Sequence, residues 1–141
     1  MINEQSIKNY LKEVKAAYNK TLVLEKKFTN LHAAYLKELE GQKEKRSLNG
    51  KISSNIVNFM SKKLTRSYLI NIFEINMFLN QAEAIYDNMP YCPNKHDAKK
   101  ACEQSSKLLI KFAYMLEDLY DYTCSLYNIE NSNINSNEIT K

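Results

Sequence analysis

Turn-forming residues are almost absent from this chain of 141 residues, which contains only two glycines and two prolines. Average usage of these two amino acids is about 7% and about 5%. A chain with so few residues suited to tight turns folds most readily into a few long helices. No stretch alternates between apolar and polar residues in the manner of a half-buried strand, so no β-sheet is expected.

A first amphipathic helix is predicted to begin after Asn3 and to end between Leu39 and Arg46. Asn3 is a suitable N-cap, and Glu4 follows it in the first turn, where the helix dipole favours a negative charge. The connector after the helix, GQKEKRSLNG, is strongly charged and bounded by glycines. One face of the helix, at about 100° per residue, collects Ile7, Tyr10, Leu11, Val14, Ala17, Tyr18, Thr21, Leu24, Phe28, Leu31, Tyr35 and Leu39.

A second helical pattern is predicted from Ser53 or Ser54 to Met89, where PYCPN places two prolines. A third is predicted from about Lys95 to Asn128, with Asn94 or Asp97 as its N-cap. The apolar face of the third comprises Ala98, Ala101, Cys102, Leu108, Leu109, Phe112, Leu116, Leu119, Tyr120, Leu126 and Tyr127.

These patterns predict an all-α fold, an antiparallel bundle of three long helices, or of four if the second helix breaks near residues 64–67. Short connectors make consecutive helices run antiparallel. Residues 1–129 are expected to form a single domain. The polar residues 130–141 show no periodicity and are expected to be disordered.

The polar side of the second helix changes midway along its most apolar stretch, YLINIFEINMFLNQ. On a helical wheel one side carries Ser67, Asn71 and Glu74, and the opposite side carries Asn76, Asn80, Glu83 and Asp87. The middle of such a helix is apolar nearly all round and is expected to be buried all round. Either an internal break repacks its two halves, or a second copy or a partner covers Leu69, Ile72, Phe73 and Met77.

Neither a membrane span nor a signal peptide is visible. Glu74 interrupts the most apolar stretch, which falls short of the roughly 18 apolar residues that a span needs. The sequence MINEQSIKNYLKEV has neither the basic nor the apolar region of a signal. We therefore expect a cytoplasmic protein, or an exported one if a signal was removed before Met1.

The chain has three cysteines, and in a cytoplasmic protein we expect them to be reduced thiols. Cys102 is expected to be buried, Cys92 exposed and Cys124 intermediate. Cys102 and Cys124 would lie roughly 33 Å apart on one helix and cannot pair, whereas a bridge between Cys92 and Cys102 stays open. Cys92, His96, Asp97 and Cys102 are zinc-ligand types, but their spacing matches no closed zinc pattern, so no metal is expected.

Catalytic constellations are lacking. Glu25 and His32 lie on the apolar face of the first helix, where they could form a base or a metal pair. Neither His32 nor His96 has a glutamate three residues before it, as the helical metal motif requires. Tyrosine hydroxyls are the expected partners of this buried pair. With no phosphate-binding glycine loop either, we expect neither enzymatic activity nor a cofactor.

Charge is distributed unevenly along the chain. The formal net charge is +8 over residues 1–66 and −4 over residues 67–141. Basic residues that could contact phosphates are Lys43, Lys45, Arg46, Lys51, Lys62, Lys63 and Arg66. The chain contains only two arginines, and acidic residues interrupt the basic run, which favours a solvated surface over nucleic-acid binding.

The segment LEDLYDYTCSLYNIEN, residues 116–131, is similar to the Leu-Tyr-Asp-Tyr segment near the last helices of flagellin-export chaperones, helical bundles that hold a partner's helices in an apolar groove. That family continues with a further helix where this chain has a polar tail, so we assign no family. Abundant asparagine, lysine, isoleucine and tyrosine, all with AT-rich codons, indicate a low-GC genome.

The function that these patterns favour is a non-enzymatic protein–protein interaction module of adaptor, chaperone or inhibitor type. It is expected to associate with itself as a homodimer of coiled-coil character, or with another protein, through the apolar centre of the second helix. Nucleic-acid binding by the basic N-terminal half is the alternative.

Overall fold

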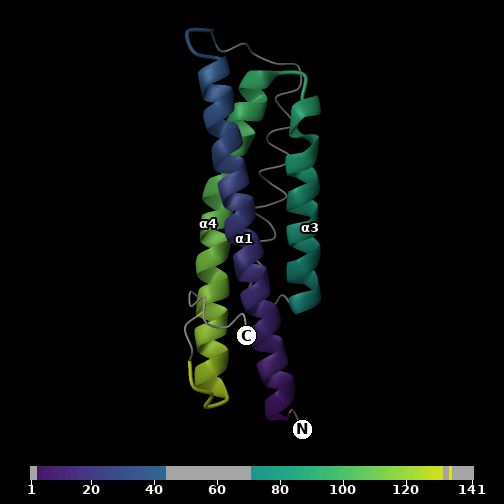
Figure 1. Cartoon of the computed structure of the whole chain (residues 1–141), viewed down its shortest axis with the longest axis vertical. Coiled ribbons are helices and arrows are strands. Elements are labelled where there is room, and N and C mark those ends of the chain that lie inside the picture. Colours follow the sequence, from purple (N-terminus) through teal and green to yellow (C-terminus); the bar gives the residue numbers. More distant parts are fainter. Residues whose placement is uncertain (1–2, 44–70, 132–133, 135–141) are drawn as a thin grey trace.

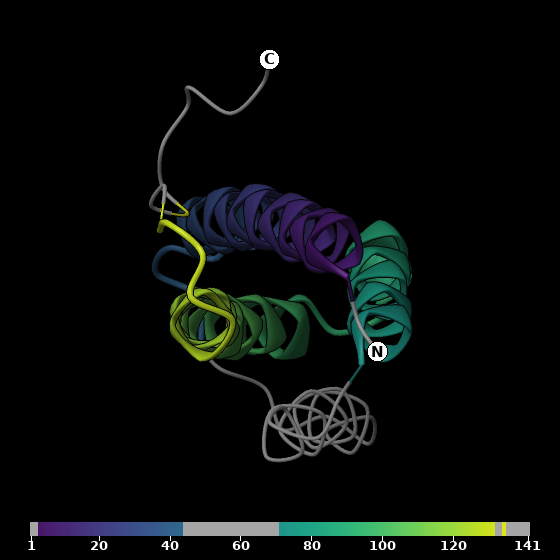
Figure 2. The ribbon, with the colours of Figure 1, turned by 90° about the horizontal axis from the view of Figure 1, so that it is seen from below.

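The structure is a computed structural model that describes residues 3–43, 71–131 and 134. Within these ranges it is mostly helical and contains no strand, which confirms the all-α expectation. Three helices pack together, with α1 alongside both of the others (Figures 1 and 2). The elements are α1 (Glu4–Glu38), α3 (Ile72–Asn88), a short 3₁₀ helix η2 (Met89–Tyr91) and α4 (Lys95–Leu126).

The ends of α1 lie where the sequence predicts them. The Oδ1 atom of Asn3 accepts a hydrogen bond from the backbone N–H of Ser6 at 2.7 Å, so Asn3 is the N-cap. At the other end Leu39 is the C-cap, and its N–H donates to the carbonyl of Tyr35. Gly41 follows with φ of +78°, a left-handed conformation that glycine adopts without a steric penalty.

Helix α4 also begins at the predicted place. The side chain of Asn94 accepts hydrogen bonds from the N–H groups of His96 and Asp97, which identifies Asn94 as the cap. The predicted apolar face is buried, or half-buried at Leu108 and Leu119, except at its end, where Leu126 and Tyr127 are exposed. These two residues occupy the last turn and the C-cap of the helix.

The long helices α1 and α4 run antiparallel. His32, in the second half of α1, contacts Glu103, which lies early in α4. Near the opposite end of the bundle, Tyr10 of α1 and Leu119 of α4 line the same pocket. The pair therefore buries one long apolar stripe from each helix against the other.

Helix α3 begins in the middle of the predicted second helix. Asn71 is extended, with φ of −79° and ψ of 169°, and its Oδ1 atom accepts a hydrogen bond from the N–H of Glu74 at 2.9 Å. Asn71 is therefore an N-cap, and the prediction of one uninterrupted helix up to Met89 is wrong. The alternative break at residues 64–67 lies outside the described residues.

Helix α3 runs in the same direction as α1. Lys20 contacts Asn80, and further along both helices Phe28 packs edge-on against Tyr86 with ring centroids 5.4 Å apart. The direction of the predicted helical residues before Asn71 relative to α1 lies outside the described residues, so the antiparallel arrangement of three or four helices stays a prediction. Across the hairpin formed by α3 and α4, Phe78 meets Phe112 with centroids 4.7 Å apart.

The chain beyond α4 contacts the bundle at two described positions. Ile134 is fully buried, and the side-chain amide of Asn131 donates a hydrogen bond to the carboxylate of Asp121 at 2.7 Å. The rest of the predicted tail lies outside the described residues, so the domain boundary after residue 129 stays a prediction.

Candidate functional site

The outer face of α3 carries exposed apolar side chains. Phe73 is 68% exposed and Met77 is 46% exposed. They lie four residues apart and are therefore neighbours on the helix surface. Ile72, beside them, is half-buried. Leu69, the fourth predicted contact residue, lies outside the described residues. We call Phe73 and Met77 the α3 surface pair.

The packing of α3 explains why this pair faces outward. The buried residues of the helix, which share its opposite side, are Ile75, Phe78, Leu79 and Ala82. Within the single chain the described part of the helix has a buried face and an exposed one, so burial all round, as predicted, requires a second copy or a partner. The change in the polar side has a local cause, because Asn71 is a cap and the helix begins only after it.

Polar contacts border α3 where it meets α1. The amine of Lys20 donates a hydrogen bond to Oδ1 of Asn80 at 2.8 Å and lies 3.8 Å from Oε1 of Glu83. Lys27 lies over the ring of Tyr86, 5.6 Å from its centroid. These contacts hold α3 against α1 and leave the α3 surface pair out of the α1–α3 contact.

The predicted basic surface is represented by one described residue. Lys43 is exposed just beyond the end of α1. The remaining residues of that prediction lie outside the described residues, namely Lys45, Arg46, Lys51, Lys62, Lys63 and Arg66. The structure therefore provides no geometry for a nucleic-acid interface.

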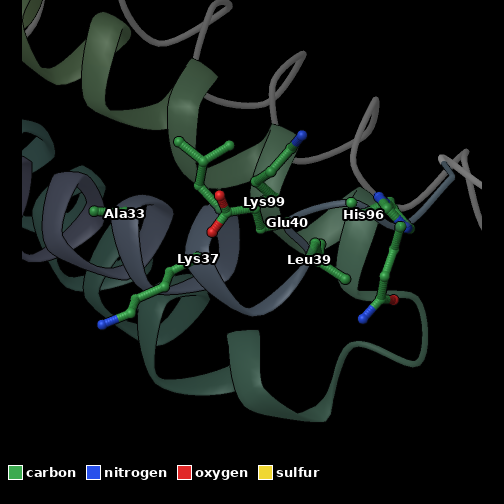
Figure 3. A pocket seen from close by; sticks show the side chains of 9 residues that line it. Ala33, Lys37, Leu39, Glu40, His96 and Lys99 are labelled. Atoms are coloured by element: carbon green, nitrogen blue, oxygen red, sulfur yellow. The ribbon is translucent and has the colours of Figure 1, made fainter.

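A pocket of about 630 Å³ lies between the end of α1 and the start of α4 (Figure 3). Its walls combine Glu40 with three basic side chains, Lys37, His96 and Lys99. Figure 3 shows the amine of Lys37 directed away from the other labelled side chains. The mixed charges do not favour one class of ligand, and no cysteine or serine lines the pocket as a nucleophile.

The thiols are more buried than the sequence predicts. Cys102 is fully buried as expected, but Cys124 is also buried, and Cys92 is only half-exposed. Cys92 donates its S–H to the carbonyl of Asn94 at 3.4 Å. All three are free thiols in this structure. Burial, with a smaller contribution from the charge of Cys92, raises the pKa of Cys102 to about 12, so Cys102 stays protonated at neutral pH.

Tyr35 of α1 lies near the same thiols. Burial is the main cause that raises the pKa of its phenol, and the charges of Cys102 and Cys92 add to it. Lys95 lies over its ring, 5.5 Å from the centroid. A protonated phenol beside a protonated thiol is a packed interior rather than an activated nucleophile.

Glu25 and His32 find separate local partners. Glu25 accepts a hydrogen bond from the hydroxyl of Thr29 at 2.7 Å. Nε2 of His32 lies 3.2 Å from Oε2 of Glu103, whose other oxygen lies 3.4 Å from the amine of Lys107. The expected tyrosine partners are therefore replaced by a threonine and a glutamate, and both residues are half-buried.

Metal-ligating side chains do not gather in the part of the chain that the structure describes. No three of its histidine, cysteine, aspartate and glutamate residues are close enough to hold an ion, and this includes Cys92, His96, Asp97 and Cys102. The described helices also lack a segment that is both long and apolar enough to cross a membrane.

Two smaller pockets beside α1 and α4 were missed from the sequence. One, of about 340 Å³, is lined mainly by apolar and aromatic side chains that include Tyr10, Tyr122 and Leu126. The other, of about 210 Å³, includes Lys8 and Lys12. Only the regular spacing of the lysines could have indicated the second.

Comparisons with family models, with curated proteins and with solved structures find no match to this chain.

Proposed function

We propose that this chain is a non-enzymatic protein-binding module that uses the outer face of α3 as its contact surface and associates first with a second copy of itself. The observation that carries the proposal is the exposure of Phe73, at 68%, on a helix whose other side carries the four buried residues of α3. Phenylalanine and methionine are enriched in protein interfaces relative to the rest of the protein surface.

The free energy available from the α3 surface pair is modest. Burying one large apolar side chain contributes about 1.5–3 kcal/mol. Association also has to offset the loss of translational and rotational freedom, which costs at least about 4 kcal/mol. The pair alone therefore supports a weak contact, and a stable complex needs a partner that covers a larger area, of roughly 1,000 Å² or more. We expect concentration-dependent self-association rather than a permanent dimer.

Adaptor, chaperone and inhibitor roles all require such a surface, and the geometry does not favour one of them. Nucleic-acid binding by the basic N-terminal half stays a prediction, because only Lys43 of its proposed contact residues is described.

The proposal is tested by light scattering of the full chain across a wide range of concentrations. The average mass should rise with concentration in the wild type and in a Val23→Asp control, which puts the same charge on an exposed apolar residue of α1, 55% exposed. Phe73→Asp and Met77→Asp should remain monomeric. Because both residues are exposed, thermal unfolding should show that the two variants stay folded.

If the wild-type chain remains monomeric at every concentration, the proposed self-association is wrong. A chain that associates equally well with Asp at position 73 would place the contact on another surface.

A further inference from the structure

Helix α3 covers only part of the length of the α1–α4 pair. Where α3 lies beside α1, contacts join residues about 60 positions apart, Lys20 with Asn80 and Phe28 with Tyr86. The start of α3 is therefore level with residues 12–14 of α1. Figure 1 shows both long helices continuing past the start of α3. The first turns of α1 and the last turns of α4 thus extend beyond the part of the bundle that α3 covers.

An apolar groove lies in this uncovered part. Its volume is about 340 Å³, and Tyr10 of α1 and Leu119, Tyr122 and Leu126 of α4 are among the residues that line it. None of the described lining residues is charged. Leu119 follows Phe112, which packs against α3, by about two helical turns and so continues the same side of α4. This end groove, as we call it, therefore occupies the place that a third helix would fill.

The α3 surface pair has dimensions and chemistry that match the end groove. Phe73 and Met77 project about 6 Å apart along their helix, and the groove side of α4 from Leu119 to Leu126 extends over about 10 Å. A phenylalanine ring packs well against tyrosine rings, and a methionine sulfur makes favourable contacts with the edges of aromatic rings. A groove without charged lining residues suits two side chains without charge.

The pair cannot enter the groove of its own chain. Phe73 and Met77 lie on the side of α3 opposite its buried residues, whereas the end groove continues the side of the α1–α4 pair that those buried residues cover. Each copy therefore exposes an apolar projection and an apolar groove to water at the same time. A contact between copies covers both surfaces, including the exposed Tyr122 and Leu126, and so adds the area that the pair lacks by itself.

We propose that the α3 surface pair of one copy enters the end groove of the next copy. This inference rests on the proposed function and names the surface that receives the pair. Because the two contacting surfaces differ, the contact is head-to-tail, and each copy retains one free pair or one free groove for a further copy.

Light scattering of full-chain variants across concentration tests the receiving surface. Tyr122→Asp should remain monomeric at concentrations at which the wild type associates. Tyr114→Asp is the matched control, because Tyr114 lies on the same helix outside the groove and is 64% exposed, against 63% for Tyr122. It should associate like the wild type. Thermal unfolding should show that both variants stay folded, and Leu126→Asp replaces Tyr122→Asp if the latter does not fold.

Mixing two variants tests the direction of the contact. Phe73→Asp retains the groove and Tyr122→Asp retains the pair, so each should be monomeric alone. An equal mixture should form a dimer with one chain of each variant and nothing larger, because only one intact pair and one intact groove can meet.

The outcomes separate this inference from the proposed function. A wild type that never associates removes both. Association that is lost in Phe73→Asp but kept in Tyr122→Asp overturns the groove as the receiving surface and leaves the proposed function in place. An equal loss in Tyr114→Asp, or a mixture that stays monomeric, also overturns the inference, because the pair would then not depend on an intact groove in the other copy.

Discussion

Helices α1 and α4 differ from α3 in how much of their surface the bundle uses. The two long helices, of 35 and 32 residues, bury a stripe along most of their length. Helix α3 has 17 residues, buries one face, and leaves Phe73 and Met77 exposed. The comparison shows that apolar character alone does not indicate burial, because only the residues on the side of a helix that packs against its neighbours are covered.

The largest expected effect on the free energy of unfolding comes from replacing a buried aromatic residue, and replacing an exposed one is the comparison. Phe112→Ala removes a fully buried ring that packs against Phe78, and should lower the free energy of unfolding by about 3–5 kcal/mol. Phe73→Ala should change it by about 0.5 kcal/mol or less, because little of that ring is buried. Urea denaturation at low protein concentration measures both. Similar losses in the two variants would show that Phe73 belongs to the core.

Cys102 should make stability fall in alkaline solution. Burial raises the pKa of its thiol in the folded protein from 9.0 to about 12. Below pH 9 both states keep the proton and the thiol contributes no pH dependence. Between pH 9 and 12 the unfolded chain releases the proton and the folded chain retains it, so the free energy of unfolding falls by about 1.4 kcal/mol per pH unit.

Denaturation of the wild type and of Cys102→Ala at several pH values between 8 and 10.5 isolates this slope. The alanine variant should lose it, while the contributions of the tyrosines remain in both proteins. Parallel curves for the two proteins would mean that Cys102 ionises as readily in the folded state as in the unfolded one.

A smaller effect is expected at the start of α3. Asn71→Ala removes the side chain that accepts a hydrogen bond from the N–H of Glu74, and should cost about 1 kcal/mol. Asn76→Ala, an exposed change inside the same helix, is the control and should be neutral or slightly stabilising, since alanine is the better helix former. Equal effects at both positions would argue that α3 does not begin at Ile72.

The smallest effect concerns the polar contact between α1 and α3. The side chains of Lys20 and Glu83 are 37% and 42% exposed and lie 3.8 Å apart, so solvent screens their attraction. Their coupling energy, from a double-mutant cycle of Lys20→Met and Glu83→Gln, should be below about 1 kcal/mol and decrease with salt. A larger coupling would mean that α3 depends on this contact rather than on its buried face.

The sequence predicts α1 and α4 well because each has one continuous apolar stripe and a capping asparagine just before it, at Asn3 and Asn94. It fails at α3 for a physical reason. An asparagine that caps a helix and an asparagine on a helix surface have the same side chain, and periodicity cannot distinguish them without the backbone conformation of Asn71.

The residues of the candidate site could be predicted from the sequence, but their exposure could not. The sequence points to Phe73 and Met77 as contact residues, but their outward direction depends on which side of α3 packs against the other helices. The pocket of about 210 Å³ beside α1 and α4 is lined by residues from both ends of the described chain, such as Lys15 and Glu130, which only folding brings together.

The central claim, that the outer face of α3 contacts a second copy, is tested most directly by photo-crosslinking. A photoreactive phenylalanine analogue at position 73, or at position 23 as the control, is introduced into the full chain, and equal amounts of unlabelled and ¹⁵N-labelled protein are mixed before irradiation. We predict crosslinked peptides of mixed isotope composition from position 73 and none from position 23. Crosslinks confined to a single chain, or equally frequent from both positions, would contradict the claim.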